Sequence, residues 1–256
     1  MGVIRTAPGE SVTFRALGLL DAFDTTHRVL SLTQIAHRAG MPLTTAQRRL
    51  RDLVDARLLE RREDGLFEIG ARMWRLGLLS RPTSMREAAL PHLQDLVART
   101  GHTVHLAVLD GHAALVVDRL AGSRTVPTRH LPGARLPLYC TAVGKALLAF
   151  APESVQEAVL VSMTAHTPFT VTDPAVLRDQ LARIRRTRLA DSRQQHRLGI
   201  ASVAVPVFGS DGGVGAGLAL IGPLAANLPA HADVLRTCAT AVAQSVALLE
   251  QRWFEE

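Results

Sequence analysis

The sequence predicts an α+β protein of two domains, a small DNA-binding unit followed by a larger mixed domain. Residues 31–70 contain two short helical patterns and then a hairpin signal. Residues 85–250 alternate between helical patterns and strand-like runs. The 256 residues are also enough for two cores, since single domains commonly hold about 100 to 200 residues.

The first helical pattern of the DNA-binding unit covers residues 32–39. Apolar residues recur there every three or four positions, which lines one face of a helix. Ser31 is a favourable N-cap, and Gly40 is suited to the left-handed position that ends a helix. A preceding apolar pattern over residues 12–23 predicts a helix that packs under this unit.

A second helix follows the Met-Pro pair and is expected to be capped by Thr44 or Thr45. The face opposite its apolar residues carries Gln47, Arg48 and Arg51. Two helices joined by a tight turn, the second with a polar outer face, fit the geometry of a recognition helix in the major groove. Arg48 and Gln47 are therefore candidate base readers.

A hairpin is predicted next, with strands over residues 58–62 and 66–69 joined by Asp64-Gly65. Arg61 and Arg62 near its tip are placed to reach DNA phosphates, although surface arginines are commonly no more than solvated charge. This pattern is typical of a winged helix-turn-helix. The candidate DNA-binding residues are Thr33, Thr44, Thr45, Gln47, Arg48, Arg51, Arg61 and Arg62.

The composition narrows the class of protein. A formal net charge of +6 favours a polyanionic partner such as double-stranded DNA. A hydrophobic content of 47% argues against a largely disordered chain, and no uninterrupted apolar run is long enough to span a bilayer. Because the first residues lack the apolar stretch of a secretory signal, we expect a cytoplasmic protein with no membrane partner. Cys140 and Cys238 lie far apart without partners at metal spacing, so no metal, disulfide or other cofactor is expected.

The helical pattern over residues 71–80 carries Trp74, Leu76 and Leu79, and Arg81-Pro82 is expected to interrupt it. Such apolar side chains would be exposed unless they met a partner, which favours a role in dimerisation. Beyond it, further helical patterns cover residues 85–100, 142–150, 174–188 and 230–253, and strand-like runs cover residues 102–109, 114–120, 136–139, 202–208 and 215–221.

Motifs of enzymes are weak in this sequence. Gly144-Lys145 lacks the first glycine, the spacer and the following hydroxyl residue of a phosphate-binding loop. The glycines of residues 212–217 join two strand-like runs rather than a strand and a helix, and no Gly-x-Ser-x-Gly sequence marks a nucleophile.

Three segments together resemble the effector-binding domain of IclR-family transcriptional regulators: GARLPLYCTAVGKALLA at 133–149, GIASVAVPV at 199–207 and GLALIGP at 217–223. With the winged head in front, the similarity covers residues 12–250. The resemblance implies a bacterial homodimer or dimer of dimers that binds a near-palindromic operator. It also implies a GAF-like C-terminal domain that binds a small-molecule effector, such as an organic acid.

The domains that follow from this resemblance are a mobile tail over residues 1–10, a winged helix-turn-helix over 11–70, a linker helix over 71–82, and an effector-binding and oligomerisation domain over 83–256. The helix pattern Pro-x-Thr-Thr with Arg48 is kept. Arg57 stands where the family usually has glycine, and it is expected to enter the left-handed region at a cost of about 1 kcal/mol.

The resemblance also implies an effector pocket lined by Leu136, Ala142, Val143, Ser192, Ile200, Ser202, Ala219 and Ile221. Thr141 is expected to cap the helix that begins at Ala142, whose first N–H groups suit a carboxylate. Because Ala219 and Ile221 stand where polar residues are frequent, we expect a narrower and more apolar pocket that prefers an aromatic or branched acid. Gln194-Gln195 replaces the usual acidic pair.

Two functions remain open at this point. The first is a ligand-responsive DNA-binding regulator, whether repressor or activator. The second is a metabolite-binding or protein-interaction module whose head has lost DNA affinity. The retained residues Thr44, Thr45, Arg48, Arg61 and Arg62 favour the first, and an enzyme is the least supported class.

Overall fold

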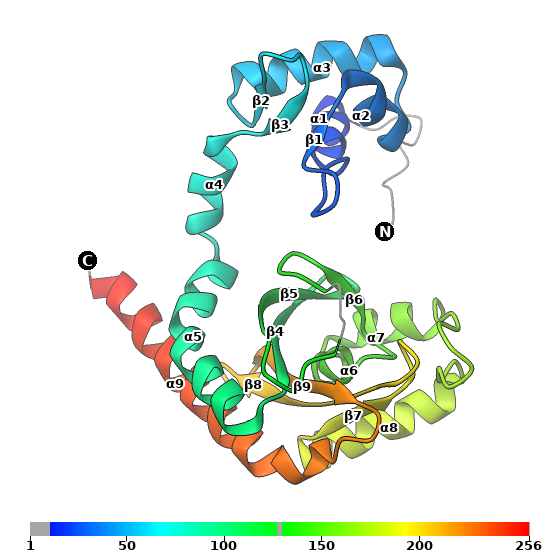
Figure 1. Ribbon diagram of the computed structural model, residues 1–256, viewed down its shortest axis with the longest axis vertical. Coiled ribbons are helices and arrows are strands. Elements are labelled where there is room, and N and C mark those ends of the chain that lie inside the picture. Colours follow the sequence, from blue (N-terminus) through cyan, green and yellow to red (C-terminus); the bar gives the residue numbers. More distant parts are fainter. Residues whose placement is uncertain (1–10, 127–129, 256) are drawn as a thin grey trace. The chain divides into compact units, whose positions relative to one another are not determined.

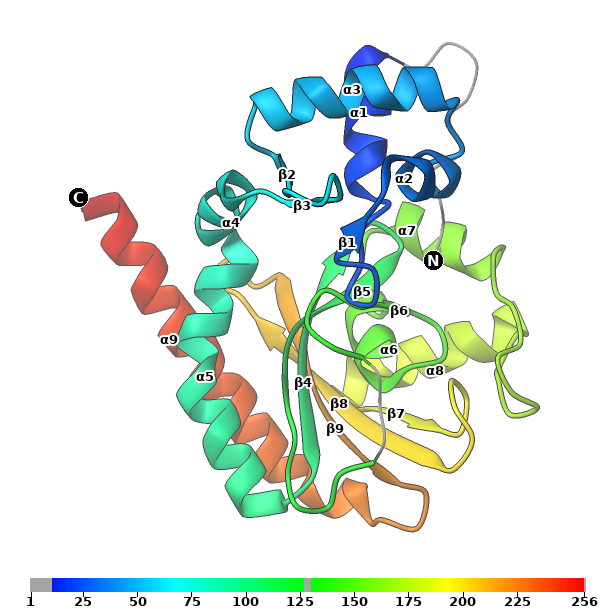
Figure 2. The same cartoon turned by 45° about the horizontal axis from the view of Figure 1, so that its top comes forward.

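The computed structural model describes residues 11–126 and 130–255, so the tail predicted over residues 1–10 lies outside the described residues. The chain separates into two compact units, Met1–Ser80 and Arg81–Glu256. Each unit has its own hydrophobic core, and each is described by itself (Figures 1 and 2).

The first unit is a winged helix-turn-helix. Its helices and strands are α1 (Val12–Leu20), β1 (Val29–Leu30), α2 (Leu32–Arg38), α3 (Leu43–Asp55), β2 (Leu59–Arg61), β3 (Phe67–Ile69) and α4 (Ala71–Leu78). The predicted hairpin is present as β2 and β3, and the short strand β1, which the sequence pattern did not indicate, extends the sheet in the order β1-β3-β2. Leu19, Ile35, Leu50 and Leu59 are fully buried where the helices meet this sheet.

The termini of α2 follow the prediction. Ser31 Oγ accepts a hydrogen bond from Gln34 N at 3.3 Å, and Gln34 Oε1 accepts one from Ser31 N at 2.8 Å, which completes a capping box. Gly40 has φ +62° directly after the helix, and Arg57 has φ +57° before the wing. The arginine at the usual glycine position therefore adopts the left-handed conformation that the wing requires.

The expected cap of α3 was wrong. The helix begins at Leu43 with Pro42 in the N-cap position, and no side chain caps it. Thr44 and Thr45 lie within the first turn, two and three residues after the N-cap position. Pro42 already has φ −58°, close to the helical value, and the helix begins directly after it.

The second unit is built on a six-stranded antiparallel sheet in the order β6-β5-β4-β9-β8-β7. Its strands are β4 (Thr103–Asp110), β5 (Ala113–Leu120), β6 (Arg135–Pro137), β7 (Ala190–Arg193), β8 (Ile200–Phe208) and β9 (Val214–Pro223). Its helices are α5 (Arg81–Thr100), α6 (Ala142–Leu148), α7 (Glu153–Leu160), α8 (Pro174–Thr187) and α9 (Ala232–Glu255), with a 3-10 turn at Leu228–His231.

Helices cover both faces of this sheet. Helices α5 and α9 pack side by side on one face, and α6, α7 and α8 share the core of the other (Figures 1 and 2). Helix α9 is long and apolar enough to cross a membrane by length and composition alone. However, Leu235 and Val242 of this helix are fully buried in the core formed with α5 and β8. The helix is therefore a core element of this domain.

The break between two helices that was expected at Arg81-Pro82 lies instead between Leu78 and Arg81. Helix α4 ends at Leu78, and α5 begins at Arg81. Pro82 occupies the first turn of α5, where a residue without an N–H is accommodated because that turn has no intrahelical acceptor.

Candidate DNA-binding surface and ligand cavity

Helix α3 presents a polar face to solvent. Ala46, Leu50 and Leu53 are buried on its other face, which fixes the rotation of the helix. Gln47, Arg48 and Arg51 are consequently exposed, as are Thr33 and Thr44, while Thr45 is half-buried. Within residues 11–126 and 130–255, neither Arg48 nor Arg51 forms an ion pair. Both guanidinium groups are available to an external partner.

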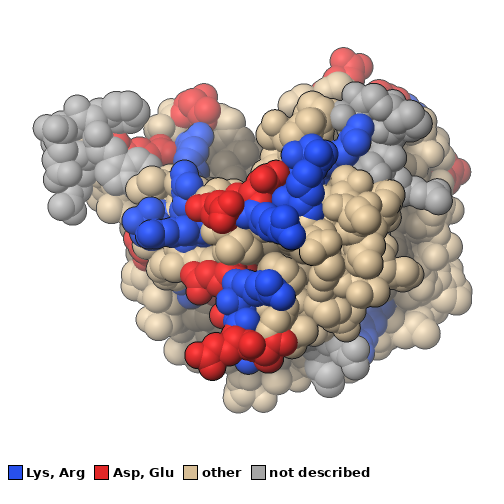
Figure 3. Space-filling model, turned by 90° about the horizontal axis from the view of Figure 1, so that it is seen from above, with Lys and Arg blue, Asp and Glu red and all other residues tan. Residues whose placement is uncertain are grey.

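The wing arginines are held by neighbouring side chains. The Arg61 guanidinium lies over the Phe67 ring, 5.8 Å from its centroid. Arg62 is paired with Asp64 at 3.3 Å and with Glu68 at 3.4 Å, and all three side chains are exposed. On the face seen in Figure 3, basic and acidic side chains lie next to one another. A phosphate contact by Arg62 would therefore compete with two carboxylates.

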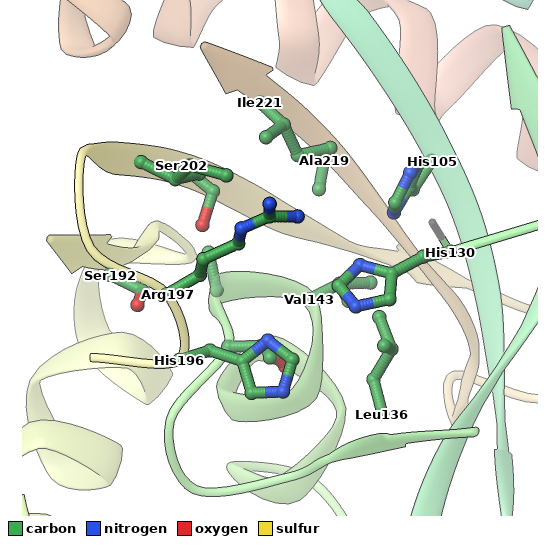
Figure 4. A pocket seen from close by; sticks show the side chains of 13 residues that line it. His105, His130, Leu136, Val143, Ser192, His196, Arg197, Ser202, Ala219 and Ile221 are labelled. Atoms are coloured by element: carbon green, nitrogen blue, oxygen red, sulfur yellow. The ribbon is translucent and has the colours of Figure 1, made fainter. Parts of the chain in front are cut away.

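A cavity of about 50 Å³ lies in the second unit, between the start of α6 and the face of the sheet formed by β4, β9, β8 and β7 (Figure 4). All eight residues that the resemblance implied line it: Leu136, Ala142, Val143, Ser192, Ile200, Ser202, Ala219 and Ile221. Five further residues that were not among the expected lining residues also line it, and these are His105, His130, Thr141, His196 and Arg197.

Strand register brings the sheet residues of the cavity together. His105 on β4 is directly opposite Ala219 on β9, and Ile221 is opposite Ser202 on β8. Ser202 is in turn opposite Ser192 on β7. Since directly opposed residues of neighbouring antiparallel strands point to the same face, these side chains form one continuous wall.

Hydrogen bonds fix helix α6 against this wall. Thr141 Oγ1 accepts a hydrogen bond from Gly144 N at 3.1 Å and donates one to Pro137 O at 2.8 Å. Ser192 Oγ donates to Cys140 O at 2.8 Å. The predicted cap at Thr141 is thus present, and it places Ala142 and Val143 at the cavity.

A buried lysine holds the loop that carries His196 and Arg197. Lys145 on α6 is only 1% exposed, and its Nζ donates to Gln180 Oε1 at 3.0 Å and to Gln195 Oε1 at 3.2 Å. Burial lowers the pKa of Lys145 to about 8, although the nearby Asp191 carboxylate raises it in part. The two glutamine oxygens thus stand where a carboxylate would pair with the cation.

Two threonines also hold this loop through hydrogen bonds to its backbone. Thr170 Oγ1 donates to Gln195 O at 2.6 Å, and Thr167 Oγ1 donates to Gln194 O at 2.7 Å. Gln194 itself has φ +58°, so the backbone turns sharply before the loop enters the cavity wall. The loop therefore has several anchors among the described residues, although it has no regular secondary structure.

The imidazole rings form a row along the cavity. The ring centroids of His105 and His130 are 6.2 Å apart, those of His130 and His196 are 5.2 Å apart, and those of His196 and His166 are 5.0 Å apart. Among the described residues, no group of three or more His, Cys, Asp or Glu side chains is arranged to hold a metal ion. The row therefore contributes ring faces and neutral hydrogen-bonding groups to the cavity.

Burial keeps the imidazoles of His105, His130 and His196 neutral at neutral pH. Burial first, and then the neighbouring His130 and Arg119, lower the pKa of His105 to about 3. Burial and the surrounding His130, His166 and Arg197 lower the pKa of His196 to about 4. Among the residues that line the cavity, Arg197 is then the charged one at pH 7. A ligand anion is the complementary partner of this lining.

The expectation of a narrower and more apolar pocket than is usual in the family stays a prediction. Ala219 and Ile221 are apolar as expected, but His105, His130, His196 and Arg197 add polar groups from strand β4 and from two loops. His105 occupies a strand position whose side-chain direction depends on register with β9, and the loop residues carry no periodic signal. The sequence pattern gave no indication that these side chains would meet.

Comparison with known proteins is consistent with both units. Residues 12–63 match the IclR helix-turn-helix domain, and residues 79–247 match the bacterial transcriptional regulator IclR C-terminal domain. The chain belongs to the IclR family. It is thus an IclR-type DNA-binding transcriptional regulator with a C-terminal effector domain, and proteins of this family are regulators rather than enzymes. The predicted family and the predicted α+β fold are both confirmed.

Several IclR-family proteins resemble the chain over most of its length. The probable transcriptional regulator SauR of Cupriavidus necator is 32% identical over 219 residues, which cover 83% of this chain and 84% of SauR. The p-hydroxybenzoate hydroxylase transcriptional activator of Acinetobacter baylyi is 30% identical over 217 residues, which cover 82% of this chain and 80% of that protein. The crystal structure of an IclR homologue from Microbacterium hydrocarbonoxydans complexed with 4-hydroxybenzoate is 31% identical, with a TM-score of 0.85, and covers 92% of this chain and 99% of that chain.

Proposed function

We propose that this IclR-family regulator binds a near-palindromic operator as a dimer or dimer of dimers, and that a small organic acid in the C-terminal cavity modulates this binding. The cavity carries the proposal, because its charged lining residue at neutral pH is Arg197. A guanidinium group is suited to a carboxylate, since it offers two parallel N–H donors to the two oxygens.

An aromatic acid is the ligand class that the lining favours. Leu136, Val143 and Ile221 give apolar contact, and the His130 and His196 rings give flat faces. A structurally similar IclR homologue was crystallised with 4-hydroxybenzoate, which is an acid of this class. The cavity has a volume of about 50 Å³, so we expect the exposed Arg197 side chain to rearrange when an aromatic ring binds.

Self-association is supported by apolar side chains on the first unit. Trp74 is 69% exposed and Leu79 is 80% exposed, at α4, and Phe14 on α1 is 62% exposed. Exposed apolar side chains of this size are costly unless a partner covers them. A second copy of the chain would cover them and present a second recognition helix to the operator. As a bacterial regulator of transcription, the protein is expected to act in the cytoplasm.

A gel-shift assay with the intergenic DNA upstream of its own gene tests the DNA-binding part of this proposal. We expect specific binding of the full chain that changes when an aromatic acid such as benzoate is added. Acid binding without DNA binding would instead favour the alternative function, a metabolite-binding or protein-interaction module with a weakened DNA-binding head. DNA binding that no organic acid alters would contradict the effector part alone.

A further inference from the structure

We propose that His105 selects effectors that carry a hydroxyl group at the end remote from the carboxylate, so that the preferred ligand is a hydroxylated aromatic acid. This inference rests on the acid effector proposed above. It adds a specificity-determining residue and a second point of recognition to that site.

The first observation is an unpaired atom. His105 is 2% exposed and lines the cavity, and its Nε2 atom is buried without a hydrogen-bond partner among the described residues. Buried polar atoms are nearly always hydrogen-bonded, because an unpaired one loses its interaction with water and gains nothing in return. A ligand atom in the cavity is a natural partner for this nitrogen.

The second observation is the placement of His105 relative to Arg197. Arg197 comes from the exposed loop on one side of the cavity, whereas His105 projects from strand β4 on the other side (Figure 4). His105 is buried, while Arg197 is exposed. A ligand whose carboxylate meets Arg197 therefore directs its opposite end toward His105.

The lining between these two residues suits a flat body. The His130 and His196 rings are 5.2 Å apart and tilted by 40°, and the side chains of Leu136 and Val143 complete the wall. Ring faces and aliphatic groups pack well against an aromatic ring, which places its far substituent at a fixed distance from the acid group.

The uncharged imidazole of His105 suits a neutral hydrogen-bonding group at this far end. His130 faces its ring, and Arg119 is directly opposite it on strand β5. With burial, these neighbours lower the pKa of His105 to about 3, so the imidazole stays neutral at neutral pH. A hydroxyl group can donate to or accept from a neutral imidazole, so it matches either tautomer.

The test compares the affinity of the full chain for benzoate with that for 3- and 4-hydroxybenzoate by calorimetry. For the wild-type protein we expect at least one hydroxybenzoate to bind about 10-fold more tightly than benzoate, because it satisfies the buried nitrogen. In His105→Leu this preference should disappear, because leucine offers the ligand hydroxyl group no hydrogen-bonding partner.

Two further variants complete the test. His112→Leu removes an exposed histidine from the turn between β4 and β5 and should retain the full hydroxyl preference. His105→Gln keeps a hydrogen-bonding side chain and should retain part of the preference, which decides the matter if His105→Leu does not fold. Equal wild-type affinity for benzoate and both hydroxybenzoates, or an unchanged preference in His105→Leu, would overturn this inference alone. Failure of the wild-type protein to bind any of the three acids would overturn the aromatic acid effector and this inference together.

Discussion

Lys145 and His105 are both buried polar residues in the effector domain, but their surroundings differ. The Lys145 ammonium has two glutamine oxygens as partners, whereas the described residues leave His105 Nε2 without one. A cation that donates its hydrogen bonds to neutral acceptors recovers only part of the interaction that it had with water. The lysine should therefore affect stability, and the histidine should affect ligand choice.

The stability of the effector domain is expected to rise between about pH 8 and pH 10.5 because of Lys145. Its pKa is about 8 in the folded chain and 10.5 ordinarily, so the unfolded chain binds more protons in this window. The gain is at most about 3 kcal/mol. Chemical denaturation of the wild type and of Lys145→Met across this window measures it. Burial raises the pKa of Cys140 to about 12, which opposes the trend, and Lys145→Met should raise this pKa further, because the nearby lysine lowers it in part. Parallel pH curves for the two proteins would contradict the prediction.

Arg48→Ala is expected to weaken binding to operator DNA more than binding to scrambled DNA. An arginine that contacts a guanine edge contributes about 1–3 kcal/mol of discrimination, whereas a phosphate contact contributes to all sequences alike. Arg62→Ala is the matched comparison, and it should weaken both complexes equally and reduce the salt dependence. Because Asp64 and Glu68 compete for Arg62, its effect should be the smaller one. Gel shifts at several salt concentrations measure both, and equal losses for Arg48→Ala on the two DNAs would exclude a base-reading role.

At the scale of single residues, the sequence analysis predicted eight of the thirteen residues that line the cavity. The residues that came from the Leu-Pro motif and the last two strands all line it. His105, His196 and Arg197 were missed because their positions depend on strand register and on a loop anchored through Lys145 and Thr170. These are long-range contacts, and no local spacing encodes them.

At the scale of elements, helix α6 packs closely against the loop that precedes it. A Cβ atom at Gly144 would lie 2.5 Å from Pro137 O, 2.5 Å from Thr141 Oγ1 and 2.7 Å from Leu138 Cα. Two of these three atoms belong to the backbone. Helix α6 can therefore keep its place against the preceding loop only with a glycine at this position.

Gly144→Ala is expected to destabilise the chain by about 1–3 kcal/mol, because the helix must move away from the loop to relieve the overlap. The same shift would displace Ala142 and Val143 from the cavity. Gly215→Ala on strand β9 is the matched control, since its Cβ would be no closer than 3.7 Å to Met85 Cε. Urea denaturation of both variants tests this expectation, and equal stability of the two would show that α6 adjusts freely.

The elements themselves were largely predictable from the sequence. Periodicity identified the long helices, and Asp64-Gly65 identified the hairpin of the wing. The short strands β1 and β7 were missed because each is formed by pairing with a distant partner rather than by its own pattern. Helix α3 begins at Leu43 because Pro42 precedes it, and the threonines gave a misleading capping signal.

On the scale of the whole molecule, the proposed self-association through the exposed apolar residues Trp74 and Leu79 predicts a link between oligomer formation and DNA binding. The double variant Trp74→Ser and Leu79→Ser is expected to shift the protein toward monomers and to weaken operator binding by at least about 10-fold, because the second head no longer binds at high effective concentration. Sedimentation and gel shifts measure the two effects, and acid binding should be unchanged.

Val161→Ser serves as the control for that variant, since Val161 is 85% exposed on the second unit. It should leave the oligomeric state and operator affinity unaltered. An unchanged oligomeric state in the double variant would mean that other surfaces hold the copies together.

The burial of Lys145 has a practical consequence for covalent chemistry. It is the single lysine in the sequence, so every other cationic side chain that stays charged at neutral pH is an arginine, which amine reagents do not modify. Reductive methylation of Nζ can proceed only in states in which α6 has separated from Gln180 and Gln195. The rate of that modification therefore reports how often this domain opens. An effector that holds the loop in place should lower this rate.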